Sequence, residues 1–109
     1  MMTKRLITAT TLTLTLLASS ALAQKKGDET KGKEVFEQCG VCHAADTDEK
    51  KMGPALKGLY KKTKLANGQK PTDAAILAII NKGKGAMPAF ADVLSADEKA
   101  DVLAYLKTL

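Results

Sequence analysis

The hydrophobic residues of this chain recur with helical spacing, first between residues 28 and 42. Gly32, Phe36 and Cys39 fall at positions i, i+4 and i+7, so they share one face of a helix. Asp28 precedes this pattern and can accept a hydrogen bond from a free backbone N–H of the first turn. We therefore predict a helix that starts after Asp28 and ends near Cys39.

Two segments in the middle of the chain also favour helices. After the Gly53-Pro54 turn, the sequence predicts a short helix that carries Leu56, Leu59 and Tyr60. Residues 72–82 follow Pro71 and stop at Gly83. A buried strand is the alternative for this apolar run, but its cap residues and alanines favour a helix.

The C-terminal segment, residues 95–109, has the clearest helical signal. Ser95 and Glu98 occupy the positions of a capping box. An apolar stripe follows at i, i+3, i+4 and i+7, made of Val102, Tyr105, Leu106 and Leu109. Because no segment alternates as a strand would and no repeat occurs, we predict an all-α domain of about four helices joined by long loops.

The first residues have the three parts of a secretory signal. Lys4 and Arg5 precede an uncharged stretch that ends in Ala21-Leu22-Ala23. An uncleaved membrane anchor is the alternative, but the threonines in this stretch weaken it. We expect residues 1–23 to be removed, leaving a domain of residues 24–109 without a membrane span, exported to the periplasm.

The charge and the composition of the 109-residue chain narrow the function further. Without residues 1–23 the chain keeps 15 basic and 12 acidic side chains, a mild excess that does not suit a nucleic-acid binder. Aromatic residues are few, with two Tyr, two Phe and no Trp. A domain this small buries a limited share of its surface, so we expect another group to complete the core.

The segment Cys39-Gly-Val-Cys-His43 holds both cysteines and the only histidine of the chain. Two thiols at this spacing can each add to a vinyl group of one haem while the adjacent histidine reaches the iron. A disulfide here would close a very small loop and stabilise little. A thioredoxin-like motif needs a βαβ context, and a zinc site needs four ligands, neither of which the chain offers. The segment therefore predicts covalent haem attachment through Cys39 and Cys42, with His43 on the iron.

The second axial ligand has two candidates once Met1 and Met2 are removed. Met87 lies in a loop rich in glycine and proline, where the backbone can bend toward the iron from the side opposite His43. Met52 follows His43 by only nine residues, which leaves little chain to pass round the haem edge. We predict that Met87 binds the iron and that Met52 is a packing or surface residue; an open sixth position is the alternative.

These residues resemble the small bacterial class I cytochromes c. The resemblance rests on CGVCH after a helix that carries Gly32 and Phe36, followed by GPALKGLY, GAMPAF and DVLAYLK, in the family's order over nearly all of residues 28–109. CGVCH is specific, whereas the other segments are individually weak and persuasive together. The resemblance implies the cytochrome c fold, wrapped round one covalently attached haem c.

The resemblance also implies roles for single residues. The backbone carbonyl of Pro54 would accept a hydrogen bond from the second ring nitrogen of His43, and Gly32 and Phe36 would pack against the last helix. One feature departs from some members of the family: residues 61–70 contain no Trp or Arg to bind the haem propionates. Tyr60, Lys57 and Lys64 are the candidate substitutes.

With both axial positions filled, the iron would exchange single electrons and the protein would not be an enzyme. We expect a free, monomeric electron carrier between a membrane complex or dehydrogenase and a terminal oxidase or reductase. Lysines near the haem would favour redox partners that are acidic around their docking site, although they could also serve only solubility. The alternatives are a permanent haem subunit of a periplasmic oxidoreductase complex, or a ligand-binding haem protein if the sixth position is open.

Overall fold

The computed structural model of this chain describes residues 26–109, so the predicted signal segment lies outside the described residues. Three α-helices form the framework: α1 (Glu29–Phe36), α2 (Asp73–Lys82) and α3 (Ala96–Leu106). A single 3-10 turn, η1 (Leu59–Lys61), lies in the long connection between α1 and α2. The described residues contain no β-strand, only one isolated bridge between Lys84 and Met87. The predicted all-α fold is therefore confirmed.

The short helix predicted to carry Leu56, Leu59 and Tyr60 is only the 3-10 turn η1, because Gly58 precedes it in the left-handed conformation with φ of 67°. The first helix ends at Phe36, three residues earlier than predicted, and α3 ends at Leu106 instead of Leu109. Among the described residues, no helix has both the length and the apolar character needed to cross a bilayer.

Local capping explains where the helices start. Asp28 accepts hydrogen bonds from the backbone N–H groups of Thr30 and Lys31 at the start of α1. Ser95 and Glu98 form the predicted capping box at the start of α3. Thr72 caps α2 by accepting a hydrogen bond from the N–H of Ala75. These bonds satisfy backbone donors that have no partner inside the helix.

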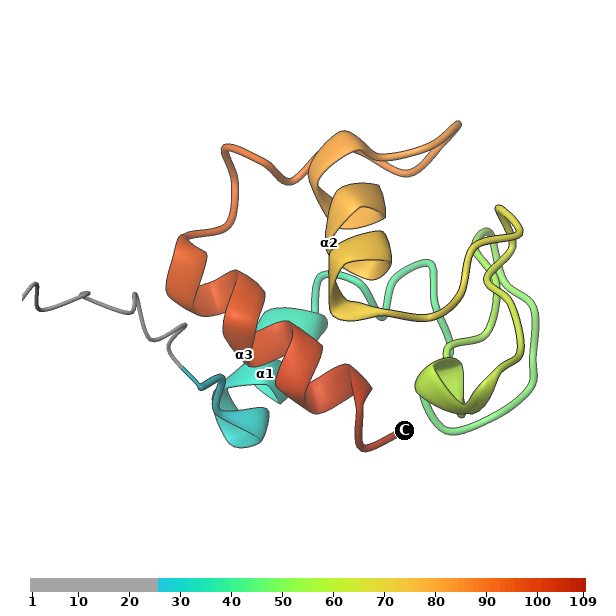
Figure 1. The fold of residues 1–109 in the computed structure, drawn as a ribbon, viewed down its shortest axis with the longest axis horizontal. Coiled ribbons are helices and arrows are strands. Elements are labelled where there is room, and N and C mark those ends of the chain that lie inside the picture. The colour runs from blue at the N-terminus through green and yellow to red at the C-terminus, as the bar shows by residue number, and fades with distance from the viewer. Residues whose placement is uncertain (1–25) are drawn as a thin grey trace, which may run out of the picture.

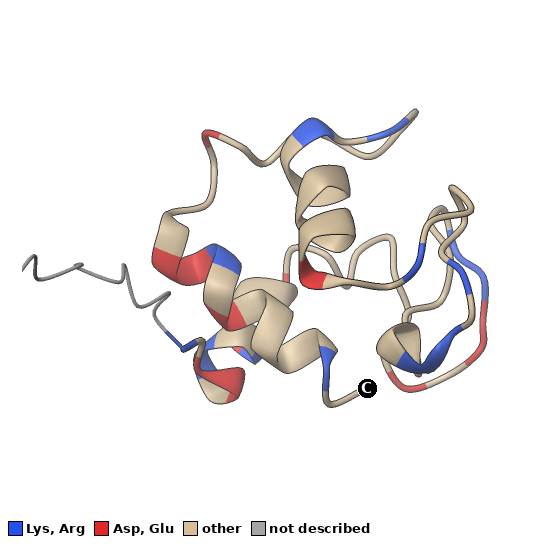
Figure 2. Cartoon of the chain, viewed as in Figure 1, with Lys and Arg blue, Asp and Glu red and all other residues tan. Residues whose placement is uncertain are grey.

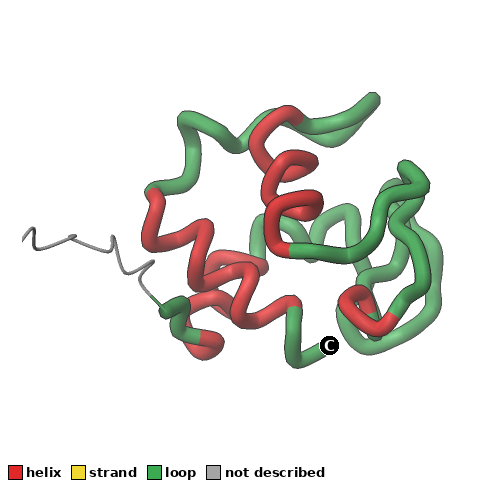
Figure 3. The backbone as a smooth tube through the Cα atoms, viewed as in Figure 1, coloured by secondary structure: helices red, strands yellow, loops and turns green. Residues whose placement is uncertain are grey.

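The crossing of α1 and α3 organises the core (Figures 1 and 3). A Cβ on Gly32 would lie 1.9 Å from the carbonyl oxygen of Asp101, so only glycine permits this approach of the two backbones. One turn further along α1, the rings of Phe36 and Tyr105 meet with their centroids 5.2 Å apart. The N–H of Asp28 also donates to the carboxylate of Asp101 at 2.8 Å. The predicted packing of Gly32 and Phe36 against the last helix is confirmed.

A polar network joins the long connection between α1 and α2 to the helices. The Tyr60 hydroxyl donates to Asp73 Oδ1 at 2.7 Å, and Lys107 Nζ donates to Asp73 Oδ2 at 3.0 Å. Lys107 Nζ also lies 5.6 Å from the centroid of the Tyr60 ring. The network thus connects η1, the first turn of α2 and the residue that follows α3.

We expect Asp73→Asn to reduce the loss of unfolding free energy that occurs as the pH falls into the acid range. The hydrogen bond from Tyr60, followed by that from Lys107, holds the pKa of the Asp73 carboxyl below its ordinary value. A carboxylate whose pKa is lowered by folding contributes stability above its unfolded pKa, and that contribution is lost as the pH falls through the folded pKa. The wild-type protein should therefore lose stability below about pH 4 more steeply than Asp73→Asn.

The measurement is the free energy of unfolding of the haem-loaded protein between pH 7 and pH 3, with Asp48→Asn as the control. Because the Asp73 and Lys107 side chains are half exposed, screening by solvent keeps the difference at pH 7 below about 1 kcal/mol. Equal acid slopes for the wild type and for Asp73→Asn would contradict this role of Asp73.

Candidate haem site

The segment Cys39–His43 follows α1 as a succession of tight turns. The N–H of Cys39 donates to the carbonyl of Phe36 at 2.7 Å, so the segment starts directly from the last core residue of the helix. The N–H groups of Cys42 and His43 both donate to the carbonyl of Cys39, at 3.1 and 2.9 Å. These bonds fix both thiols and the imidazole relative to the crossing of α1 and α3.

The two cysteines are free thiols in different surroundings. Cys39 is half-buried and packs against the hydrophobic core, and this burial raises the pKa of its thiol. Cys42 Sγ lies 3.9 Å from Met52 Sδ, and the Met52 side chain is 76% exposed. A group attached to both sulfurs would therefore have one edge against the core and the other near the surface.

The His43 ring is held by the Gly53-Pro54 turn. Its Nδ1 lies 2.7 Å from the carbonyl oxygen of Pro54. A carbonyl can only accept, so Nδ1 carries the proton of this bond and Nε2 keeps its lone pair for a metal. The turn is itself tied to the motif, because the N–H of Gly53 donates to the carbonyl of Cys42 at 2.9 Å.

The sequence predicts Gly53 only as part of a turn, but in the structure it is a residue of the site. A Cβ at this position would lie 2.4 Å from His43 Cε1, which is far shorter than a van der Waals contact. The backbone of Gly53 therefore forms the wall against which the ring packs. The Gly-Pro dipeptide signals a turn in the sequence, but nothing in the sequence shows that the histidine lies against it.

Met87 lies on a short hairpin that follows α2. Backbone hydrogen bonds join Lys84 and Met87 in both directions, at 3.1 and 3.0 Å. A Cβ on Gly83 would lie 2.3 Å from the carbonyl oxygen of Met87, so the hairpin folds closely over this glycine. The N–H of Phe90 then returns to the carbonyl of Ile80 at 2.9 Å, which anchors the hairpin to α2.

The structure places the predicted site residues in two groups. Cys39, Cys42, His43 and Pro54 form one connected unit, whereas Met87 belongs to the α2 hairpin, and no hydrogen bond among the described residues joins the two. Met87 is half-buried, in contrast to the exposed Met52. The Tyr60 hydroxyl, a candidate for binding a haem propionate, donates instead to Asp73.

The residues present fit a haem. Two free thiols stand beside an imidazole whose Nε2 is left open, and a thioether is offered by a separate loop. These are the donor types that attach and ligate a c-type haem. The cradle that Gly53 provides for the imidazole also fixes the ring's orientation, as ligating histidines require. Cys39 and Cys42 would hold the haem, and His43 and Met87 would face its iron.

Known proteins resemble this chain over most of its length. The family described as "Cytochrome C oxidase, cbb3-type, subunit III" matches residues 27–106. Cytochrome c6 of Rippkaea orientalis is 38% identical over 92 residues, covering 84% of this chain and 77% of that protein. Cytochrome c6 of Picosynechococcus sp. is 35% identical, covering 96% of this chain and 92% of that protein.

A solved structure agrees with these sequence matches. Cytochrome c6 from the diatom Phaeodactylum tricornutum superimposes with a TM-score of 0.59 at 34% sequence identity. The superposition covers 75% of this chain and 93% of the diatom protein. The range matched by the family includes all the candidate site residues, from Cys39 to Met87.

Proposed function

This chain belongs to the class I mono-haem c-type cytochromes, and from that premise we propose that it carries single electrons in the periplasm with both axial positions of its haem filled by protein. Members of this family carry electrons on one covalently attached haem c, and so does this chain. In the proposed site, Cys39 and Cys42 form the thioether bonds. His43 and Met87 are the axial ligands.

The observation that carries this proposal is the contact of His43 Nδ1 with the Pro54 carbonyl, at 2.7 Å. It leaves Nε2 as the only ring nitrogen available to a metal and fixes the ring without help from the haem. The haem, when bound, supplies the exchange of one electron between ferrous and ferric iron. A thioether ligand from Met87 favours the ferrous state and so raises the reduction potential. Because neither axial position is open to a substrate, we infer that the protein is not an enzyme.

Carbon monoxide tests whether the site is closed. We expect carbon monoxide at neutral pH to leave the visible spectrum of the reduced wild-type protein unchanged, because Met87 occupies the sixth position. Met87→Ala should bind carbon monoxide, since alanine offers no ligand. Rapid binding of carbon monoxide by the wild-type protein would instead support a ligand-binding haem protein.

The predicted signal segment, residues 1–23, supports an exported location for the carrier. The name of the matched family, a subunit of a cbb3-type oxidase, favours a second candidate: a haem subunit held permanently in a membrane complex. Gel filtration of a gentle extract from the source cells distinguishes the two. A free carrier should elute as a small monomer with the mass expected for a chain that begins at Gln24. A subunit should instead elute with its complex.

The lysines of the 44–71 loop support the proposal that the redox partner is acidic around its docking site. In Figure 2 acidic positions lie on α1, on α3, at the start of α2 and in the first part of this loop, whereas basic positions predominate along the rest of the loop and on the α2 hairpin. In the stretch 50–70 the chain has seven lysines and no acidic residue: Lys50, Lys51, Lys57, Lys61, Lys62, Lys64 and Lys70. Val41, which is 78% exposed, and Met52 add an uncharged surface next to the haem attachment. Such a surface steers negatively charged partners toward it.

We expect Lys50→Gln to slow reduction of ferricyanide at low ionic strength more than Lys33→Gln does. Both substitutions remove one exposed positive charge, but Lys33 lies on α1 with the acidic residues. The difference should vanish as added salt shortens the Debye length to about 3 Å at 1 M. Stopped-flow mixing at several salt concentrations provides the rates. Equal rates for the two variants would mean that the lysines contribute only net charge and solubility.

A further inference from the structure

We propose that Met52 is a site of reversible oxidation by hydroperoxides, and that its sulfoxide slows electron exchange at the surface beside the haem attachment. The modification itself rests on the surroundings of Met52 alone. Its effect on electron exchange rests in addition on the proposed function.

The two methionines of residues 26–109 lie in contrasting surroundings. Met52 is 76% exposed, whereas Met87 is half-buried in the hairpin that follows α2. In the proposed site the Met87 sulfur also donates a lone pair to the iron. Among the described residues the large exposed hydrophobic side chains are Val41, Met52 and Val93, and Met52 is the one that carries an oxidisable atom.

Backbone and side-chain bonds on both sides of Met52 fix it against the haem-attachment segment. Lys51 Nζ donates to the carbonyl of Gly40 at 3.3 Å, and the N–H of Gly53 donates to the carbonyl of Cys42 at 2.9 Å. Between these two bonds, Met52 Sδ lies 3.9 Å from Cys42 Sγ. An oxygen added to Met52 Sδ would therefore lie beside one of the two sulfurs that carry the haem.

Attachment of the haem leaves the Met52 sulfur available to an oxidant. In the free chain the Cys42 thiol is the weak donor that faces Met52 Sδ. When this thiol adds to a vinyl group, its hydrogen moves to the vinyl carbon, and Cys42 Sγ becomes a thioether that cannot donate. Met52 Sδ then keeps its lone pairs, and its exposure lets a small peroxide reach them.

The reaction is a two-electron oxygen transfer. A lone pair of Met52 Sδ attacks one oxygen of the hydroperoxide, an S–O bond forms and the O–O bond breaks. With hydrogen peroxide, the proton on the transferred oxygen passes to the departing hydroxide, which leaves as water. Methionine is thus oxidised to the sulfoxide while the peroxide is reduced, and methionine sulfoxide reductases reverse the change.

The sulfoxide changes the character of this surface. Val41, which is 78% exposed, and Met52 are uncharged and apolar, and they lie next to the haem attachment. Oxidation replaces the apolar thioether by a polar, chiral group. A partner that covers the surface must strip water from the new oxygen, which costs free energy unless the partner supplies a hydrogen bond.

Peptide mass spectrometry tests the modification on the haem-loaded ferric protein treated with dilute hydrogen peroxide. Trypsin cleaves after lysine, so Met52 is recovered in the peptide 52–57 and Met87 in the peptide 85–99. We expect the first peptide to gain one oxygen atom at least about tenfold faster than the second. Equal rates, or faster oxidation of the Met87 peptide, would overturn the assignment.

Electron self-exchange between ferrous and ferric copies tests the effect without a partner protein, and NMR of mixed samples measures its rate. We expect peroxide treatment to slow self-exchange of the wild-type protein about fivefold. Met52→Leu keeps the volume but has no sulfur, so its rate should be the same before and after treatment. Treatment with a methionine sulfoxide reductase should restore the wild-type rate.

Val93→Met, made in the Met52→Leu protein, provides the matched control. It places a methionine at another exposed apolar position, 62% exposed in the wild type. In Figure 1 the segment that leads into α3 lies on the opposite side of the molecule from the 44–71 loop. This variant should be oxidised without a change in self-exchange.

An oxidised Met52 with an unchanged self-exchange rate, or equal slowing in the Val93→Met control, would overturn the proposed effect. Either result leaves the proposed function intact. That function fails only if the untreated wild-type protein lacks a haem with a one-electron transition.

Discussion

Replacing Cys39 and Cys42 together by alanine is expected to leave a chain that is largely unfolded. The helices have only 8, 10 and 11 residues, and isolated helices of this length are marginal in water. The core cluster of buried residues is small: Phe36, Leu59, Leu65, Ile76, Val102, Leu103 and Leu106. Its largest interface joins α1 to α3, while the long 37–72 connection adds few buried side chains. Without the covalent haem, Leu59 and Leu65 are the residues of this connection that remain in the core cluster.

Circular dichroism on heating tests this expectation. The wild-type protein should unfold in one cooperative transition, whereas the double variant should show little helical signal and no sharp transition. Val41→Ala is the control, because Val41 lies between the two cysteines but is 78% exposed. That variant should keep its haem and its transition. A double variant with native helix content and cooperative melting would show that the chain folds without covalent haem.

Gly32→Ala should destabilise the haem-loaded protein by about 3 kcal/mol, near the upper end for an overpacked core. Its Cβ would lie 1.9 Å from the Asp101 carbonyl oxygen and 2.8 Å from Tyr105 Cβ, so α1 and α3 must separate. Separation weakens the contact between the Phe36 and Tyr105 rings, which are now 5.2 Å apart. It also strains the hydrogen bond between the Asp28 N–H and Asp101.

Gly40→Ala provides the matched control. A Cβ on Gly40 would find its nearest neighbour at 3.5 Å, an ordinary contact distance, so the added methyl group fits. The backbone of Gly40 does not have a positive φ. Denaturant unfolding followed by circular dichroism should therefore separate the two variants by about 3 kcal/mol. A similar loss for both would mean that the close approach of α1 and α3 does not limit stability.

Features governed by neighbouring residues could be predicted from the sequence. The caps at Asp28 and Ser95 depend on bonds within one turn, and the stripes on α1 and α3 depend only on helical spacing. The end of α1 was harder to place. Cys39 continues the i, i+4, i+7 pattern of Gly32 and Phe36, yet the chain has already left the helix, because the backbone turns of residues 37–42 replace helical bonds.

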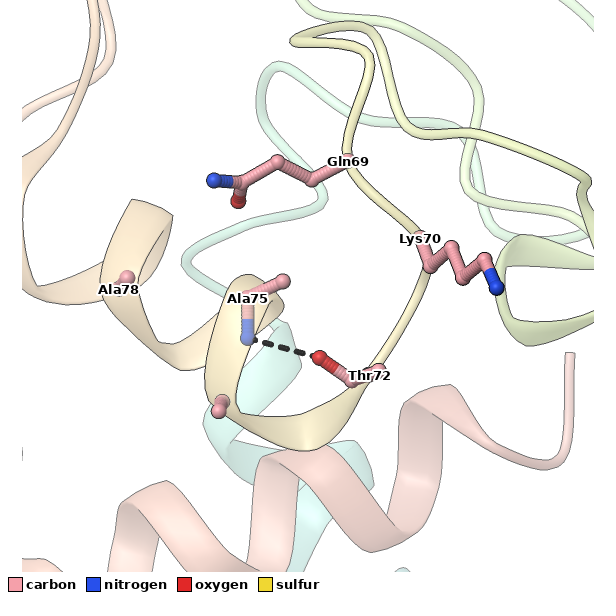
Figure 4. Close-up of a pocket in the computed structure, with 6 residues that line it drawn as sticks. Gln69, Lys70, Thr72, Ala75 and Ala78 are labelled. Carbon is pink, nitrogen blue, oxygen red and sulfur yellow. Dashed lines mark hydrogen bonds between the residues drawn. The ribbon is translucent and has the colours of Figure 1, made fainter.

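Contacts between distant segments could not be predicted in this way. The bond between Tyr60 and Asp73 depends on how the 37–72 connection folds back on α2, and no local pattern records that path. The same is true of the open hollow beside α2 that Gln69, Thr72 and Ala75 line (Figure 4). The contact between His43 and Pro54 was expected only through the resemblance to cytochromes c, and its geometry is now visible. The ligation of iron by His43 and Met87 stays a prediction.

The visible absorption spectrum of the purified protein tests the central claim, that His43 and Met87 both bind the iron. Sharp c-type bands should appear on reduction, and the ferric protein should show the weak far-red band of iron bound by thioether sulfur. That band should vanish in Met87→Ala and survive in Met52→Ala. Covalent haem without the band in the wild-type protein, or a band lost with Met52 instead of Met87, would contradict the proposed ligands.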